Sequence, residues 1–183
     1  MSAQFVLLSG CSGGGKSTLL AELARRGFGT VEEPGRRVIK AEFASGGQAL
    51  PWVDLAAFAR RAIEISLNDR SAAAAALPVT AQPGWVFFDR GLVDAAAALA
   101  HATGEPALER LGREHRYNET VFLTPPWPEI FAADAERRLD LEDATAEYER
   151  LQRAYRALGY RLVILPKTSV ESRADLVLAE LGR

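Results

Sequence analysis

Short apolar runs alternate along the chain with longer stretches in which apolar residues recur at helical spacing. The apolar runs show no polar alternation, which is typical of strands buried on both faces of a sheet. A glycine, a proline or an aspartate lies at or just beyond the end of each run. We expect strands at residues 5–8, 28–32, 85–89, 121–123 and 162–165.

The stretches between these runs carry their apolar residues on one helical face. Residues 16–26 end at Gly27, which suits a helix C-terminus, and Asp54 suits the start of a long helix through the alanines at 72–76. We expect helices at residues 16–26, 36–44, 55–76, 93–102, 105–111, 144–158 and 170–181.

Alternating strands and helices predict an α/β fold in which a parallel sheet is covered by helices on both sides. The carboxyl ends of parallel strands meet at one edge of the sheet, so a ligand is expected along that edge. No internal repeat and no linker divides the sequence. We therefore expect one domain over residues 1–183.

Composition and charge restrict the partners and the compartment. The 183 residues carry a net charge of −2, so no overall positive field favours nucleic acid or a membrane surface. Cys11 is the one cysteine, which excludes an intrachain disulfide and favours a reducing compartment. The N-terminal residues lack the pattern of a signal peptide, and no apolar run is long enough to span a membrane. We expect a cytoplasmic protein.

The glycine-rich stretch at residues 10–17, GCSGGGKS, fits the pattern G-x-x-x-x-G-K-[ST] between a buried strand and an amphipathic helix. Such a loop lets backbone N–H groups surround a phosphate, and the helix N-terminus adds positive charge. We expect Lys16 to bridge the β- and γ-phosphates of ATP and the Ser17 hydroxyl to bind Mg²⁺. The other predicted nucleotide-binding positions in the loop are Gly10, Ser12, Gly13, Gly14, Gly15 and Thr18.

Cys11 lies inside this loop, where a helix N-terminus can acidify a thiol. His101 and His115 are distant in sequence, so neither is an evident partner for a cysteine nucleophile. We expect Cys11 to fill space in the loop and the two histidines to be surface or structural residues.

Asp89 ends the buried run at residues 85–89, where a carboxylate organises the magnesium ion in folds of this kind. A hydrolytic ATPase often places a glutamate next, to activate water. The next residue here is Arg90, whose guanidinium suits the oxygens of a second substrate or of the transferring group. This pair favours phosphoryl transfer over hydrolysis.

The Asp89-Arg90 pair resembles the Asp-Arg pair of thymidylate kinases and the Glu-Arg pair of deoxynucleoside kinases. Together, VEEPGRR and FFDRGLVDA resemble most closely a bacterial ATPase/kinase family that includes the kinase domain of ribosylnicotinamide kinases. The resemblance implies a three-layer P-loop NTPase fold with a five-stranded parallel sheet in the order 2-3-1-4-5. It also implies Asp89 at magnesium, Arg90 on the acceptor, and Glu33 as hydroxyl ligand or general base. Whether Glu33 or Asp89 is the base stays open.

The charged segment at residues 134–143 corresponds to the lid of such kinases, with Arg137 and Arg138 closing over the phosphates. A solvent-exposed helix is the alternative for this segment. Pro166 and Lys167 follow the last strand, where the adenine ring lies in related kinases. We expect them to contact ATP.

The sequence favours an ATP-dependent kinase for a small-molecule acceptor, with transfer to a hydroxyl or to a phosphate. Thymidylate kinases usually have an Asp where Ser12 stands, and no counterpart of their phosphate-binding arginines is evident. The resemblance favours an acceptor of the nucleoside or nucleotide kind. The alternative is a regulatory or sensing ATPase with no acceptor. Nucleic acid is not expected as a partner, and a homodimer is left open.

The aromatic residues provide no signal for the acceptor. They could line a cleft, but core packing is the favoured interpretation for Trp52, Phe58, Trp85 and Trp127.

Overall fold

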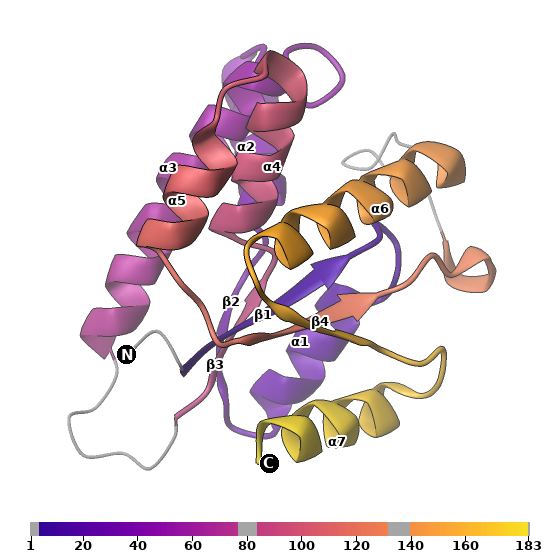
Figure 1. The fold of residues 1–183 in the computed structure, drawn as a ribbon. Helices are drawn as coiled ribbons and strands as arrows, with labels where there is room; N and C mark the ends of the chain where they lie inside the picture. Colours follow the sequence, from indigo (N-terminus) through magenta and orange to yellow (C-terminus); the bar gives the residue numbers. More distant parts are fainter. Residues whose placement is uncertain (1–3, 77–83, 132–139, 183) are drawn as a thin grey trace.

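The computed structural model describes residues 4–76, 84–131 and 140–182. Its centre is a five-stranded parallel sheet in the order β2-β3-β1-β4-β5, which confirms the predicted architecture and strand order. Figure 1 shows this sheet between layers of helices. The strands are β1 (Phe5–Gly10), β2 (Gly29–Val31), β3 (Val86–Asp89), β4 (Thr120–Thr124) and β5 (Arg161–Ile164).

Helices cover both faces of the sheet because successive side chains of β1 enter opposite cores. Val6 and Leu8 pack in the core under α1 and α7, whereas Phe5 and Leu7 pack in the core under α3 to α6. No helix in the described part of the chain is both long and apolar enough to cross a membrane. The helices are α1 (Lys16–Arg25), α2 (Pro34–Ser45), α3 (Leu55–Ala76), α4 (Leu92–Thr103), α5 (Ala107–Glu114), α6 (Leu141–Ala157) and α7 (Val170–Leu181).

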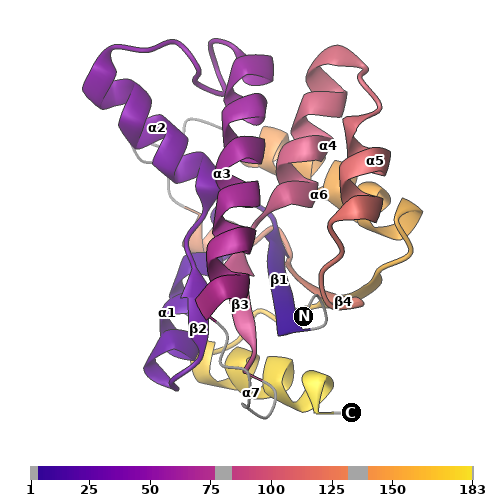
Figure 2. The ribbon, with the colours of Figure 1, turned by 90° about the vertical axis from the view of Figure 1, so that its left-hand side faces the viewer.

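The helices α2, α3, α4 and α5 stand next to one another, on the side of the molecule away from α7 (Figure 2). In the chain, α2 and α3 connect β2 to β3, and α4 and α5 connect β3 to β4. This group of helices therefore lies beside the carboxyl ends of β2 and β3, which are followed by Glu33 and Arg90.

Helices α2 and α6 begin two and three residues earlier than predicted. Pro34 starts α2 because the fixed φ of proline suits the first helical position, which needs no N–H donor. Helix α6 begins at Leu141, where the Asp140 side chain accepts a hydrogen bond from the Asp143 N–H. The last residues of the predicted lid therefore form the cap and first turn of α6.

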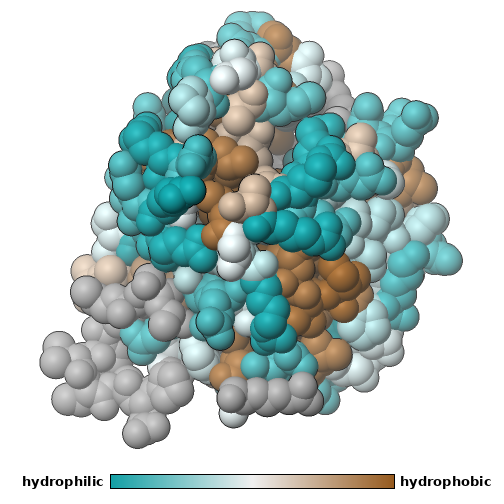
Figure 3. Space-filling view, in the orientation of Figure 1, coloured by the Kyte–Doolittle hydropathy of each residue, from teal (hydrophilic) through white to brown (hydrophobic). Residues whose placement is uncertain are grey.

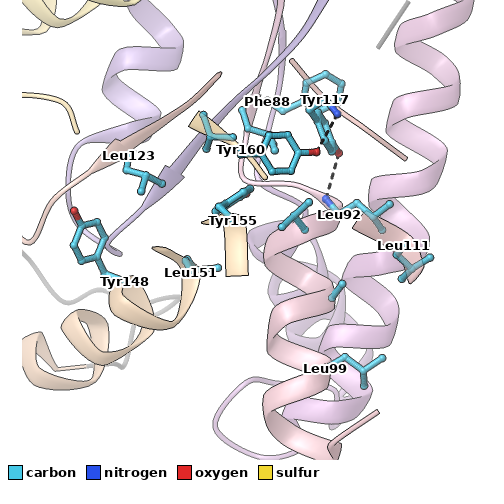
Figure 4. Close-up of a cluster of buried hydrophobic side chains, with 14 of the residues drawn as sticks. Phe88, Leu92, Leu99, Leu111, Tyr117, Leu123, Tyr148, Leu151, Tyr155 and Tyr160 are labelled. Atoms are coloured by element: carbon cyan, nitrogen blue, oxygen red, sulfur yellow. Dashed lines mark hydrogen bonds between the residues drawn. The ribbon is translucent and has the colours of Figure 1, made fainter. Parts of the chain in front are cut away.

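Buried tyrosines fix the start of α4, directly after Asp89 and Arg90 (Figure 4). The Leu92 N–H donates to the Tyr117 hydroxyl over 3.3 Å, and the Tyr117 N–H donates to the Tyr160 hydroxyl over 3.2 Å. Phe88 packs edge-on against Tyr117, with ring centroids 5.5 Å apart. These contacts hold the end of β3 against α4, so the residues between them have little freedom.

The edge strand β5 leaves apolar side chains at the surface. Ile164 is 45% exposed, and Leu162 and Val163 are half-buried. Figure 3 shows an apolar patch between α6 and α7, where this strand lies.

Candidate active site

The glycine-rich loop between β1 and α1 has a backbone that most residues cannot adopt. Gly10, Gly13 and Gly15 have φ angles of 114°, 78° and 79°, in the region that favours glycine. A Cβ at Gly10 would collide with the backbone of Thr124 at the end of β4, and one at Gly14 would lie 2.7 Å from the Thr124 hydroxyl. The loop therefore needs glycine both for its conformation and for its packing against β4.

Lys16 begins α1 and is buried at the loop. Its Nζ donates to the Cys11 carbonyl oxygen over 2.8 Å. Burial lowers the pKa of Lys16 and the nearby Arg90 charge lowers it further, against the charges of Asp89, Glu33 and Glu147. An anion bound in the loop would offset the free-energy cost of burying the Lys16 charge, which the nearby carboxylates offset only in part.

Asp89, at the end of β3, is only 2% exposed. Its Oδ2 accepts a hydrogen bond from Ser17 Oγ over 2.9 Å, and its buried Oδ1 has no hydrogen-bond partner. Burial and the Glu33 charge raise the pKa of Asp89 to about 6. A hydroxyl beside an unpartnered carboxylate oxygen offers the hard oxygen ligands that Mg²⁺ prefers, so the pair fits this ion.

Arg90 is the one non-glycine residue in the described part of the chain with a positive φ, 59°. Two parallel bonds of 3.0 Å join its Nη1 and Nη2 to the Glu147 carboxylate on α6, and Nη2 also donates to the Gly10 carbonyl over 3.2 Å. Its Nε lies 3.3 Å from Glu33 Oε1, and its Nη1 lies 3.6 Å from Asp94 Oδ1. The guanidinium thus connects the loop with carboxylates from three other segments.

Sequence reasoning missed Glu147 and Asp94. Asp94 accepts hydrogen bonds from Ser9 Oγ over 2.5 Å and from the Tyr155 hydroxyl over 2.6 Å, so its carboxylate is held by β1 and α6. Asp94 stands four residues after Arg90 in the same motif, a spacing that could have indicated it. Glu147 carries no local signal, because only the docking of α6 brings it to Arg90.

A cavity of about 260 Å³ opens beside Arg90. Its lining includes Ser12 of the loop, Glu33 and Arg36 at the start of α2, and the aromatic side chains of Trp52 and Phe58. Trp52 and Phe58 therefore line a cleft, which is the less favoured of the two interpretations, and Phe58 also packs against a small buried cluster, as the favoured one predicts.

A second cleft, of about 380 Å³, contains Ser17 and Asp89 in its lining. Glu33 and Arg36 line both spaces. Glu33 therefore stands between the hydroxyl–carboxylate pair and the aromatic cavity.

Thr18, Pro166 and Lys167 line neither of these two spaces. Arg137 and Arg138 lie outside the described residues. Thr18 is exposed on the first turn of α1, and Pro166 and Lys167 are exposed between β5 and α7. Cys11 is buried, with its Sγ 3.5 Å from the Ala144 carbonyl oxygen of α6. The described ranges contain no group of three or more His, Cys, Asp or Glu side chains arranged to hold a metal ion.

The glycine loop at the start of α1 and the 2-3-1-4-5 sheet together define a P-loop fold of the kinase kind. A family model described as an AAA domain matches residues 5–173, and the chain belongs to this family. None of the curated protein sequences compared with the chain matches it significantly.

Solved structures show the same fold. Deoxyadenosine kinase from M. mycoides with bound dATP has a TM-score of 0.67 at 12% identity, over 98% of this chain and 100% of that one. The NadR protein in complex with NR has a TM-score of 0.66 at 22% identity, over 100% of this chain and 52% of that one. Shikimate kinase from Acinetobacter baumannii in complex with shikimate has a TM-score of 0.58 at 16% identity, over 98% and 93%. The predicted likeness to small-molecule P-loop kinases is thus confirmed at the level of the fold.

Proposed function

We propose that this protein is an ATP-dependent kinase that transfers the γ-phosphate of ATP to a hydroxyl group of a small, nucleoside-like molecule. The observation that carries the proposal is the aromatic-walled cavity of about 260 Å³ between Ser12 of the loop and Glu33. A sensing or purely hydrolytic ATPase has no use for a cavity of this kind beside its γ-phosphate. A phosphotransferase requires one, because the acceptor must sit in line with the phosphate.

The charges around the cavity favour an acceptor that carries no phosphate. Arg90 is already clamped by Glu147, and Arg36 Nε lies 3.5 Å from Glu33 Oε2. A phosphorylated acceptor would meet an excess of negative charge, which disfavours it by like-charge repulsion. The titratable residues of the lining are two guanidinium groups, Arg36 and Arg90, and four carboxylates, Glu33, Asp94, Asp143 and Glu147.

In the proposed reaction the loop amides and Lys16 hold the phosphates of ATP, and Ser17 and Asp89 hold Mg²⁺. When bound, the ion would supply positive charge at the phosphate oxygens. Glu33 would orient the acceptor hydroxyl and accept its proton as the new P–O bond forms and the bond between the γ-phosphorus and ADP breaks, because Glu33 lines the aromatic cavity and Asp89 does not. Arg90 fixes Glu33 and Glu147 at the cavity, and its position on the lining lets it contact the acceptor.

A coupled assay of ADP release tests the proposal, using nucleosides, their monophosphates and sugars as acceptors. We expect stimulation by a nucleoside-like compound without phosphate. Glu33→Gln should lower that turnover about 100-fold while Mg-ATP affinity, measured by calorimetry, stays unchanged. Glu64→Gln, which alters an exposed carboxylate on α3, is the matched control and should behave like the wild type.

The other outcomes separate the alternatives. If a nucleoside monophosphate stimulated ADP release, the proposed acceptor class would be wrong, but the proposed kinase activity would stand. Steady hydrolysis that ignores every acceptor and is unaffected by Glu33→Gln would replace the kinase with a sensing ATPase.

A further inference from the structure

A second buried arginine lies against the glycine loop from the side of α7. Arg173 is only 4% exposed, and its Nη1 lies 3.3 Å from the Gly15 carbonyl oxygen and 3.4 Å from that of Gly14. A Cβ on Gly15 would lie 2.9 Å from the same Nη1. The guanidinium of Arg173 therefore occupies space that a side chain at position 15 would fill.

The charge of Arg173 has no carboxylate partner within ion-pair distance in residues 4–76, 84–131 and 140–182. Its buried Nε has no hydrogen-bond partner, and the guanidinium carbon lies 5.4 Å from the ring centroid of Trp127. Arg90, which is also buried, has three carboxylates around it. Burial lowers the pKa of Arg173, because a desolvated cation is disfavoured.

A buried, unpaired cation costs free energy that a protein normally avoids by pairing it or replacing it. The contacts of Arg173 indicate what offsets this cost. The Gly14 and Gly15 carbonyls belong to the peptide groups whose N–H donors are on Gly15 and Lys16. A positive donor at a carbonyl polarises its peptide group and makes the opposite N–H a stronger donor.

We propose that Arg173 is a positioning residue for the polyphosphate of the nucleotide: it holds the loop from outside and supplies a positive charge that the bound phosphates balance. This inference rests on the proposed nucleotide binding. The inference predicts that the Arg173 side chain lowers the stability of the ligand-free protein and raises its affinity for the nucleotide. A purely structural arginine would stabilise the free protein.

Arg173→Met, which keeps most of the side-chain volume, separates the two roles. We expect the thermal midpoint of the free protein to rise by about 2–4 °C, because a buried unpaired charge is removed. Mg-ATP affinity should fall about 10-fold, and the loss should be smaller for AMP than for ATP. Arg173→Lys keeps a positive charge and should retain more affinity than Arg173→Met.

Arg70→Met is the matched control. Arg70 also has a buried nitrogen without a hydrogen-bond partner and also stacks on aromatics, 4.2 Å from the centroid of Tyr117, but it does so away from the loop. Its removal should leave Mg-ATP affinity unchanged.

A lower thermal midpoint for ligand-free Arg173→Met, or an ATP affinity equal to that of the wild type, would overturn the inference. Equal losses in Arg173→Met and Arg173→Lys would show that charge is not the cause and would overturn it as well. If the wild type itself binds no nucleotide, the proposed function fails instead, and calorimetry on the wild type distinguishes the two results.

Discussion

The two ends of helix α1 carry charged groups in opposite situations. At the N-terminal end, burial lowers the pKa of Lys16, so the fold disfavours the charge that this side chain carries. At the C-terminal end, hydrogen bonds from Arg25 and Arg26 lower the pKa of Glu22 to about 2, so the fold favours its charge. Arg26 also bonds Asp175 of α7 over 2.6 Å.

The two ends of this ten-residue helix thus differ in whether the protein itself stabilises the charges that they carry. At the C-terminal end, Glu22, Arg26 and Asp175 form ion pairs with one another or with Arg25, and these pairs help to hold α1 against α7. At the N-terminal end, the charge of Lys16 is balanced only in part by the protein and is suited to an anion that comes from outside. Buried groups held in a costly state are a sign of a functional site.

Among the substitutions at the two ends of α1, Lys16→Met should have the largest effect on nucleotide affinity. Mg-ATP affinity is expected to fall on the order of 100-fold, because a charge-assisted contact to phosphate is lost. The free protein should be at least as stable as the wild type, since a desolvated charge is removed. Calorimetry and thermal unfolding measure the two effects. A marked loss of stability would show that Lys16 supports the fold.

Two glycines, one at each end of α1, allow a matched comparison in which the expected effects are of intermediate size. Gly15 and Gly27 both have positive φ angles, 79° and 91°, but a Cβ on Gly27 would meet nothing within 4 Å. Gly27→Ala should cost about 1–2 kcal/mol of backbone strain and leave nucleotide binding unchanged. Gly15→Ala should cost more and also weaken Mg-ATP binding, because Arg173 must move. Urea unfolding and calorimetry measure both, and equal effects at the two positions would contradict the comparison.

Glu22→Gln should have the smallest effect and no influence on nucleotide affinity. The pKa of Glu22 is about 2 in the folded protein against its ordinary value of 4.5, so the carboxylate adds stability above about pH 4.5. That contribution is lost as the pH falls from 4.5 towards 2. The thermal midpoint of the variant should therefore lie below that of the wild type at pH 7, and the difference should shrink in this acid range. A difference that does not depend on pH would mean that the ion pairs are not its source.

Much of the fold could be predicted because its signals are local. The alternation of apolar runs and amphipathic stretches indicated the parallel sheet, and a resemblance in two short motifs supplied the strand order that the structure confirms. Boundaries moved where capping decides them, as at Pro34 and Asp140. The approach of Glu33 to Asp89 also follows from the sequence, since β2 and β3 are neighbours whose carboxyl ends meet at one edge.

What the sequence by itself determined is the glycine loop, with its lysine and serine at the start of a helix, because backbone conformation and phosphate geometry restrict those residue types within a few positions. Only the tertiary structure decided which charges are paired. Glu147 clamps Arg90 because α6 crosses the end of the sheet, Arg173 lies behind the loop because α7 packs on α1, and Trp52 faces a cavity instead of the core. Such contacts join segments far apart in the chain, and their energy depends on which faces of the helices meet. Residue spacing along the sequence does not record that information.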